Sequence, residues 1–175
     1  MRQLLLLRHA KSSWDDRDLA DHDRPLNPRG HQAATAMRGA IQSLGLIPDQ
    51  VLVSTATRTL QTLEALEPWP ERPLIDPLDT LYLAPSPMLL VTLRGTAETV
   101  RSLMLVGHNP GLHELALLLV GAHGMVPGDE HTRALAQGFP SGALAEFSVP
   151  GPWHTLDTGG AHLARFITPR SLPGG

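Results

Sequence analysis

The stretch LLLLRHAKSSW, residues 4–14, brings four leucines directly against two strongly polar side chains. A run of four apolar residues is too short to indicate a helix, and it is typical of a strand buried on both faces of an α/β sheet. Arg8 and His9 follow the last leucine, and both need water, a partner or a substrate. Ligands of open α/β sheets bind beyond the carboxyl ends of the strands. The stretch therefore predicts a buried strand with a candidate site at its end.

The composition is that of a folded protein. The chain has 175 residues, of which 42% are hydrophobic and 18% charged, and its formal net charge is -3. We expect a single domain over residues 1–169 and a short, frayed tail over residues 170–175. No block of like charge indicates a general nucleic-acid or membrane surface, although these numbers allow a local cationic pocket.

Some classes of site and of protein are excluded by what the sequence lacks. There is no cysteine, which excludes disulfides, zinc–thiolate sites and cysteine nucleophiles. The apolar run near the N-terminus is too short for a signal peptide, and no stretch of the sequence approaches the length of a membrane span. We therefore expect a cytoplasmic protein with no nucleic-acid or membrane partner. The sequence leaves the oligomeric state open.

Strand and helix patterns alternate along most of the chain, with loops expected at residues 10–27 and 124–142. Continuous apolar or alternating runs predict strands at residues 3–9, 49–55, 72–77, 101–107, 143–149 and 162–168. Helices are expected at residues 28–44, 56–68, 86–95 and 111–121. In the second of these, Leu60, Leu63 and Leu66 are expected to share one face. The alternation favours an α/β fold, with a mainly parallel central sheet and helices on both faces.

Four polar residues lie at or just after the ends of the predicted strands. Arg8 and His9 end the first strand, Arg58 follows the second within a turn, and His108 follows the fourth. Arginine is a forked donor suited to phosphate oxygens, and histidine can attack phosphorus and carry the phosphoryl group. Each residue alone has an ordinary alternative, such as a solvated helix arginine or a turn histidine. Their shared position at one sheet edge favours a phosphoryl-transfer site.

Three blocks of the sequence resemble the signature blocks of the histidine phosphatase superfamily, which includes the phosphoglycerate mutases. These blocks are LRHAKSSW, STATRTLQT and VGHNPGL. The segments DRPLNPRG, LYLA and SGALAEF add a likeness to the SixA-type phosphohistidine phosphatase branch. The likeness extends from residue 4 to about residue 169. It implies a three-layer α/β sandwich and a phosphatase that uses a histidine nucleophile and needs no cofactor.

The same resemblance assigns roles to the residues at the strand ends. His9 resembles the nucleophile that becomes phosphorylated, and Arg8 and Arg58 resemble the two phosphate clamps. His108 resembles the second active-site histidine, which contacts the phosphoryl group. The guanidinium groups would supply the positive charge that a metal supplies in other phosphoryl-transfer enzymes, so we expect no metal.

Four further positions are placed by the resemblance. Ser12 stands where the superfamily often has a serine near the phosphate, and Arg24, in DRPL, is a feature of the SixA-type branch that would add positive charge to the pocket. Both are candidate phosphate-binding residues. Asp15 stands where many superfamily members have asparagine, and we expect it to face away from phosphate because its charge would repel it. The mutases use a glutamate as general acid, and the equivalent position here is occupied by Thr80. Asp79 beside it is therefore a candidate proton donor, with a turn-capping aspartate as the alternative.

The missing glutamate favours a phosphohistidine substrate carried by another protein. Imidazole leaves from phosphorus with less acid assistance than a sugar alkoxide, because its nitrogen can be protonated near neutral pH. The segment between Arg58 and His108 is also short, which leaves little chain for a lid. The alternatives are a broad phosphomonoesterase for small phosphoesters on the same scaffold and a phosphate-binding module without turnover.

A metal enzyme is a further alternative, since the chain has nine histidines. His108, His113 and Glu114 lie close in sequence, but there is no HExxH motif and no cysteine ligand. His113 falls in an apolar helix, where a packed or capped histidine is the ordinary interpretation. We therefore expect no metal site.

Overall fold

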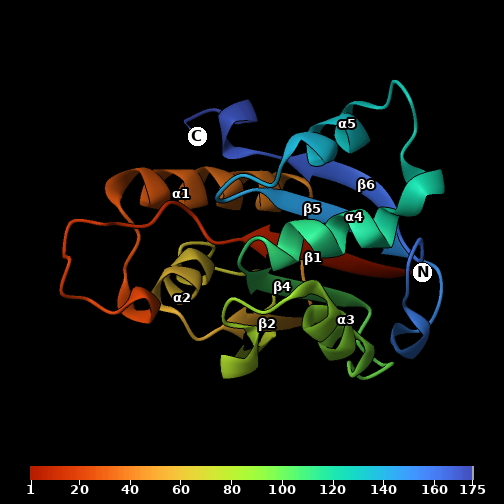
Figure 1. Cartoon of the computed structure of the whole chain (residues 1–175), viewed down its shortest axis with the longest axis horizontal. Helices are drawn as coiled ribbons and strands as arrows, with labels where there is room; N and C mark the ends of the chain where they lie inside the picture. Colours follow the sequence, from red (N-terminus) through yellow and green to blue (C-terminus); the bar gives the residue numbers. More distant parts are fainter. Residues whose placement is uncertain (175) are drawn as a thin grey trace.

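The computed structural model describes residues 1–174, which form one six-stranded sheet between layers of helices (Figure 1). The strands lie in the order β3-β2-β4-β1-β5-β6. Their bounds are β1 Arg2–Arg8, β2 Gln50–Ser54, β3 Leu74–Leu78, β4 Ser102–Gly107, β5 Leu144–Val149 and β6 His162–Ile167. The first four in this order pair in parallel, and β5 runs antiparallel to both of its neighbours. The predicted mainly parallel sheet is confirmed.

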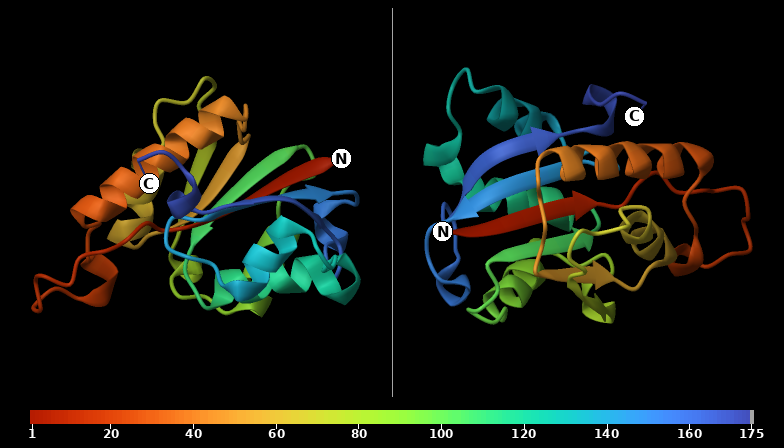
Figure 2. Two further views of the ribbon diagram at one scale, coloured as in Figure 1. Left: turned by 90° about the horizontal axis from the view of Figure 1, so that it is seen from above. Right: turned by 180° about the vertical axis from the view of Figure 1, so that it is seen from behind.

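Helices cover both faces of the sheet, as Figure 2 shows from above and from behind. Helices α1 and α2 pack on one face, and α3, α4 and α5 pack on the other. Their bounds are α1 Pro28–Ser43, α2 Thr57–Glu64, α3 Ser86–Arg94, α4 Gly111–Gly124 and α5 Glu130–Gln137. Within residues 1–174, no helix is both long and apolar enough to cross a bilayer.

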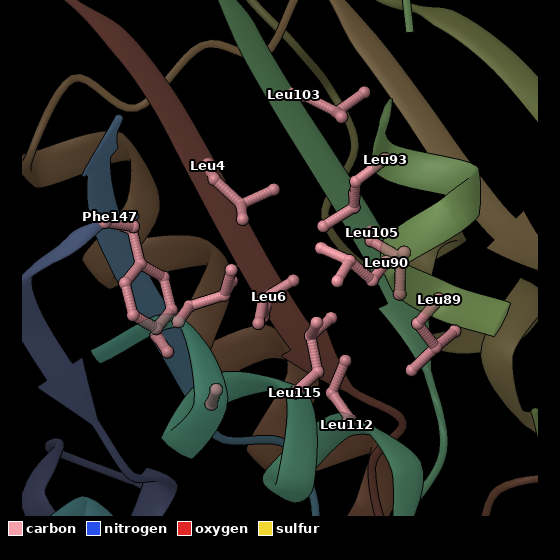
Figure 3. Close-up of a cluster of buried hydrophobic side chains, with 14 of the residues drawn as sticks. Leu4, Leu6, Leu89, Leu90, Leu93, Leu103, Leu105, Leu112, Leu115 and Phe147 are labelled. Atoms are coloured by element: carbon pink, nitrogen blue, oxygen red, sulfur yellow. The ribbon is translucent and has the colours of Figure 1, made fainter. Parts of the chain in front are cut away.

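Strand β1 is central, and its leucines divide between two hydrophobic clusters. Leu4 and Leu6 belong to the cluster under α3 and α4 (Figure 3), and Leu5 and Leu7 belong to the cluster under α1 and α2. All four leucines are fully buried. Successive side chains of a strand point to opposite faces, so a strand covered on both faces needs apolar residues at every position. This requirement explains the continuous run of leucines.

The segment that follows β1 is held against the start of α1. The Asn27 side chain caps this helix by accepting a hydrogen bond from Gly30 N at 2.8 Å, and Asn27 N donates to the Lys11 carbonyl oxygen at 2.9 Å. A Cβ atom at Gly30 would lie 2.1 Å from that same Lys11 oxygen. Only glycine allows this approach, and the contact fixes the chain two residues after His9.

The prediction of a loop over residues 124–142 is wrong at its centre, where α5 forms. The Asp129 side chain caps α5 by accepting from Thr132 N at 2.8 Å, and Thr132 and Leu135 are buried. The helix is short and buries one large apolar residue, Leu135. Its apolar periodicity is therefore too weak to stand out in the sequence.

The predicted helix over residues 56–68 is too long, and one of its leucines is wrongly placed. Leu63 and Leu66 are buried, but Leu60 is 38% exposed. The face of α2 that turns inward carries Thr59 and Thr62 instead. Both threonine hydroxyls donate to backbone carbonyl oxygens at 2.7 Å, which allows these polar residues to be buried.

The tail expected to be frayed is partly ordered. Pro169–Ser171 form a 3-10 turn, Pro169 is buried, and Leu172 packs against the cluster under α1 and α2. The sequence PRSLPGG suggests fraying because it is rich in proline and glycine, but the turn is held by contacts with distant residues.

Two glycines of α1 allow a matched test of the contact after β1. Gly30→Ala should lower the free energy of unfolding by about 1–3 kcal/mol, because the new methyl group collides with backbone. Gly39→Ala has nothing within 4 Å and should raise it by about 0.5–1 kcal/mol, because alanine favours a helix. Urea unfolding of both variants checks this, and effects of equal sign would contradict it.

Candidate active site

A cleft of about 890 Å³ opens at the carboxyl end of the central strands. The sequence-predicted residues that line it are Arg8, His9, Ser12, Asp15, Arg24, Arg58 and His108. Asp79 is not among the residues that line the cleft. The cleft lies within the usual size range of ligand pockets, which is about 300–1,000 Å³.

His9 lies at the end of β1, where one ring nitrogen is hydrogen-bonded and the other has no partner within residues 1–174. Its Nδ1 lies 2.7 Å from the Ala10 carbonyl oxygen, and its backbone N–H donates to the Gly107 carbonyl oxygen at 3.1 Å. A carbonyl oxygen only accepts, so Nδ1 carries the proton and Nε2 keeps its lone pair. Burial lowers the pKa of His9 to about 4, and the positive charge of Arg58 acts in the same direction. The ring is therefore neutral at pH 7, with a nucleophilic nitrogen.

His108 lies next to His9, with the two ring centroids 5.3 Å apart. Its Nε2 is 2.7 Å from the Ser54 hydroxyl oxygen, while its buried Nδ1 has no hydrogen-bond partner among the described residues. Burial lowers the pKa of His108 to about 3, and charge on His9 would lower it further. Two neutral histidines side by side avoid the repulsion that two imidazolium rings would create.

Arg8 shares a hydrogen-bond acceptor with Asn109, the residue that follows His108. Its Nη1 donates to the Phe139 carbonyl oxygen at 3.0 Å, and Asn109 Nδ2 donates to the same oxygen at 2.9 Å. Arg8 Nε is buried and has no partner among the described residues. Burial and the nearby charge of Arg58 lower the pKa of the Arg8 guanidinium. The two arginines are thus like charges gathered in one cleft.

Asp21 anchors both of the other buried arginines. Arg58 Nη2 lies 3.0 Å from Asp21 Oδ2, and Arg58 Nη1 donates to the Asp21 carbonyl oxygen at 2.7 Å. Arg24 Nε lies 3.1 Å from Asp21 Oδ1. Arg58 is 2% exposed and Arg24 7% exposed, so both guanidinium groups need such partners. Asp21 offsets part of the positive charge that they bring to the cleft.

Tyr82 completes this network from the turn after β3. Its hydroxyl donates to Asp21 Oδ2, and its ring meets the His108 ring edge-on at 5.5 Å between centroids. The Tyr82 hydroxyl is the main reason that the pKa of Asp21 falls to about 2, and Arg58 and Arg24 lower it as well. Asp21 is therefore a carboxylate at neutral pH and cannot supply a proton there.

Arg24 also organises the loop after His9. Its Nη1 donates to the Ser12 hydroxyl oxygen at 2.8 Å and to the Ser13 carbonyl oxygen at 3.1 Å. Its guanidinium carbon lies 3.5 Å from the centre of the Trp14 ring, which is 72% exposed. The structure thus places Ser12 and Arg24 together at the cleft, with an exposed aromatic ring beside them.

Asp15 and Asp79 lie apart from the network that Asp21 forms with Tyr82 and the two arginines. Asp15 is exposed, so water screens its charge, and it is one of the residues that line the cleft. That its carboxylate faces away from phosphate stays a prediction. Asp79 accepts a hydrogen bond from the Thr55 hydroxyl at 2.6 Å, and Thr55 in turn contacts His22 at 3.0 Å. The role of Asp79 as a proton donor stays a prediction.

Three residues of the cleft region were missed by sequence reasoning. These residues are Asp21, Tyr82 and Trp14. Asp21 and Tyr82 come together from segments 61 residues apart, and no local pattern marks such a pair. Trp14 ends the stretch LLLLRHAKSSW, residues 4–14. An aromatic residue so soon after the predicted site residues Arg8 and His9 could have marked it as part of the cleft.

His113 and Glu114, which were considered as possible metal ligands, do not face a metal site within the described residues. His113 Nε2 is 2.7 Å from the Leu135 carbonyl oxygen, and Glu114 is exposed. Among residues 1–174, no group of three or more histidine, aspartate or glutamate side chains is arranged to hold a metal ion. His113 is a helix histidine capped by backbone, which is the ordinary interpretation of its position.

Comparison with known proteins identifies the class of this site. Residues 4–76 match the model of the histidine phosphatase superfamily, branch 1. An uncharacterized chloroplastic protein of Arabidopsis thaliana is 34% identical over 185 residues, which cover 97% of this chain and 79% of that protein. The chain therefore belongs to the histidine phosphatase superfamily, and it is a phosphatase.

Solved structures narrow the match to a branch. The SixA protein of Nakamurella multipartitia has a TM-score of 0.83 and 30% identity, with 96% of each chain covered. The SixA protein of Agrobacterium tumefaciens has a TM-score of 0.80 and 30% identity, with 95% of this chain and 97% of that chain covered. The branch within the superfamily is the SixA type, as the sequence resemblance predicts.

The depressed histidine pKa values predict an unusual titration. NMR of the imidazole signals should show His9 with a pKa of about 4 and His108 with a pKa of about 3. The unfolded chain, with ordinary histidine pKa values near 6.5, binds more protons between about pH 4 and pH 6.5. The free energy of unfolding should therefore fall as the pH drops through this window. Titration of either ring near 6.5 would contradict the electrostatics described above.

Proposed function

We propose that the protein removes phosphoryl groups from phosphohistidine carried by another protein, with His9 as the nucleophile. One observation carries this proposal: a neutral His9, whose Nε2 has no partner among the described residues, shares a cleft with Arg8 and Arg58. Such a nitrogen can attack phosphorus, and flanking guanidinium groups stabilise the charge on the transferred group.

The reaction proceeds in two phosphoryl transfers. In the first, His9 Nε2 forms a bond to phosphorus while the bond to the substrate imidazole nitrogen breaks, and that nitrogen leaves with the electron pair. In the second, the oxygen of water forms a bond to phosphorus while the bond to His9 breaks, and the electron pair returns to Nε2. One proton of the water stays on the departing phosphate, and the other passes to solvent. Arg8, Arg58 and His108 are proposed to bind the phosphoryl oxygens throughout, with Ser12 and Arg24 as further contacts.

The acid–base groups of the cleft favour a phosphorus–nitrogen bond over an alkyl ester. The described carboxylates that line it are Asp15 and Asp21. Asp21 is held ionised by Tyr82 and two arginines, so it has no proton to give to a leaving alkoxide. An imidazole leaving group needs less acid assistance. Two SixA relatives, whose names give them as candidate phosphohistidine phosphatases, point to the same substrate.

A broad phosphomonoesterase is the second candidate, because Asp15 also lines the cleft and is exposed. Turnover of a phosphohistidine protein should exceed turnover of sugar phosphates under identical conditions. A clear preference for sugar phosphates would replace the first candidate with the second. Asp15→Asn should then reduce the activity on phosphoesters, whereas phosphohistidine hydrolysis should tolerate this change.

The nucleophile and the clamps can be tested separately. Rapid quenching with a ³²P-labelled substrate should trap label on the wild-type protein and none on His9→Ala. The matched control is His162→Ala, at an exposed histidine, which should still trap label. Arg8→Ala should lower kcat/KM by about 10²–10³, as expected for loss of one charge-stabilising donor. The exposed Arg101, replaced by alanine, is the control for the loss of charge. Retained activity in Arg8→Ala would end the assignment of this site.

A further inference from the structure

A second cleft of about 970 Å³ adjoins the candidate active site. Lys11, Arg29 and Ser141 line both clefts, so the two spaces meet at these residues. From there the second cleft extends to the C-terminal turn, where Arg170 lines it. Of these two clefts, only the first is lined by the candidate catalytic residues, which are Arg8, His9, Arg58 and His108. The second cleft is therefore available to the chain on either side of a phosphorylated side chain bound at these residues.

The charged residues that line the second cleft are all cations. Lys11, Arg29 and Arg170, which we call the basic strip, are exposed, and no Asp or Glu lines this cleft among the residues described. Within residues 1–174, none of the three makes an ion pair. The chain as a whole has a net charge of -3, so the strip differs in sign from the average surface. Such a surface attracts and orients acidic ligands.

The basic strip is attached firmly to the catalytic end of β1. Gly142 N donates to the carbonyl oxygens of Arg8 and His9, at 3.1 and 3.0 Å. Pro169 Cγ lies 3.0 Å from the place that a Cβ of Gly142 would occupy, so the turn that carries Arg170 packs on this loop. The backbone of Lys11 is fixed by the start of α1. The fold therefore fixes the backbone of Lys11 and of the turn that carries Arg170 relative to His9.

A third cleft, of about 1280 Å³, continues the groove along β6 and favours a polypeptide. It shares Gln32, Ala134, Phe166 and Thr168 with the second cleft. Beyond these its lining is mixed: it includes the apolar residues Ala40, Ile167 and Leu172 and the charged residues Glu130 and Arg165. A nucleic acid would need a longer run of cations along its phosphates. A polypeptide can place acidic residues on the strip and apolar residues beyond it.

We propose that the basic strip docks an acidic segment of the protein that carries the phosphohistidine, next to the modified residue. This inference rests on the proposed function, and it adds a recognition surface that begins at the edge of the candidate active site and extends beyond it. It predicts that flanking sequence, as well as the phosphoryl group, determines which protein is dephosphorylated.

The test compares free phosphohistidine with two peptides that carry it, one flanked by Asp and Glu and one flanked by Lys. The wild-type protein should have the higher kcat/KM on the acidic peptide, and added salt should reduce that advantage. Arg170→Glu should lower kcat/KM on the acidic peptide by about threefold to fivefold and leave free phosphohistidine unchanged. Gln137 lines the second cleft but not the first, so a positive charge can be added there. Gln137→Lys should raise kcat/KM on the acidic peptide.

Arg101→Glu is the matched control, since Arg101 is exposed and lines none of the three clefts. Equal losses on the peptide and on free phosphohistidine in Arg170→Glu would overturn the docking proposal, as would no loss on either. The proposal would also be overturned if a single-stranded oligonucleotide inhibited the protein as strongly as the acidic peptide does. A wild-type protein inactive on free phosphohistidine and both peptides would instead overturn the proposed function itself.

Discussion

The parallel pairing of β1 with β4 is the constraint on which the site depends. Arg8 lies opposite Gly107 in this pairing, so His9 and His108, the next residues of the two strands, emerge together. Four identical leucines do not distinguish one register from another shifted by two residues. The polar ends of the strands do, because Ser102 donates to Gln3 Oε1 at 2.7 Å at one end, and His9 N donates to Gly107 O at the other.

The second constraint is the concentration of positive charge beyond these strand ends. Arg8, Arg24 and Arg58 line the same cleft, and like charges so close together destabilise the folded state unless they are offset. Asp21 supplies the offset through contacts with Arg24 and Arg58, and Tyr82 keeps it ionised. Burial, aided by the residual positive charge, lowers the pKa of both histidines and keeps them neutral, and that charge suits the cleft to an anion.

Much of the fold and part of the site could be predicted from the sequence, for a physical reason. Arg8, His9 and His108 directly follow buried strands, and Arg58 lies in the first turn after one, so their positions follow from local patterns. Asp21 depends on the path of a loop, which tertiary contacts decide, and it escaped prediction. Helix α5 escaped because it buries too little apolar surface to leave a clear periodicity. The exposure of Leu60 shows that a leucine in a helix need not mark its buried face.

The contact between Asp21 and Arg58 bears on the end of the catalytic cycle. Arg58 Nη2 donates to the Asp21 carboxylate, and Arg58 Nη1 donates to the Asp21 backbone carbonyl oxygen. In the proposed reaction a phosphoryl group must share or exchange these bonds, so part of its binding energy is offset by the carboxylate it displaces. The same carboxylate is in place to take back the guanidinium group when phosphate departs. An internal competitor of this kind weakens the hold on product and favours turnover over retention.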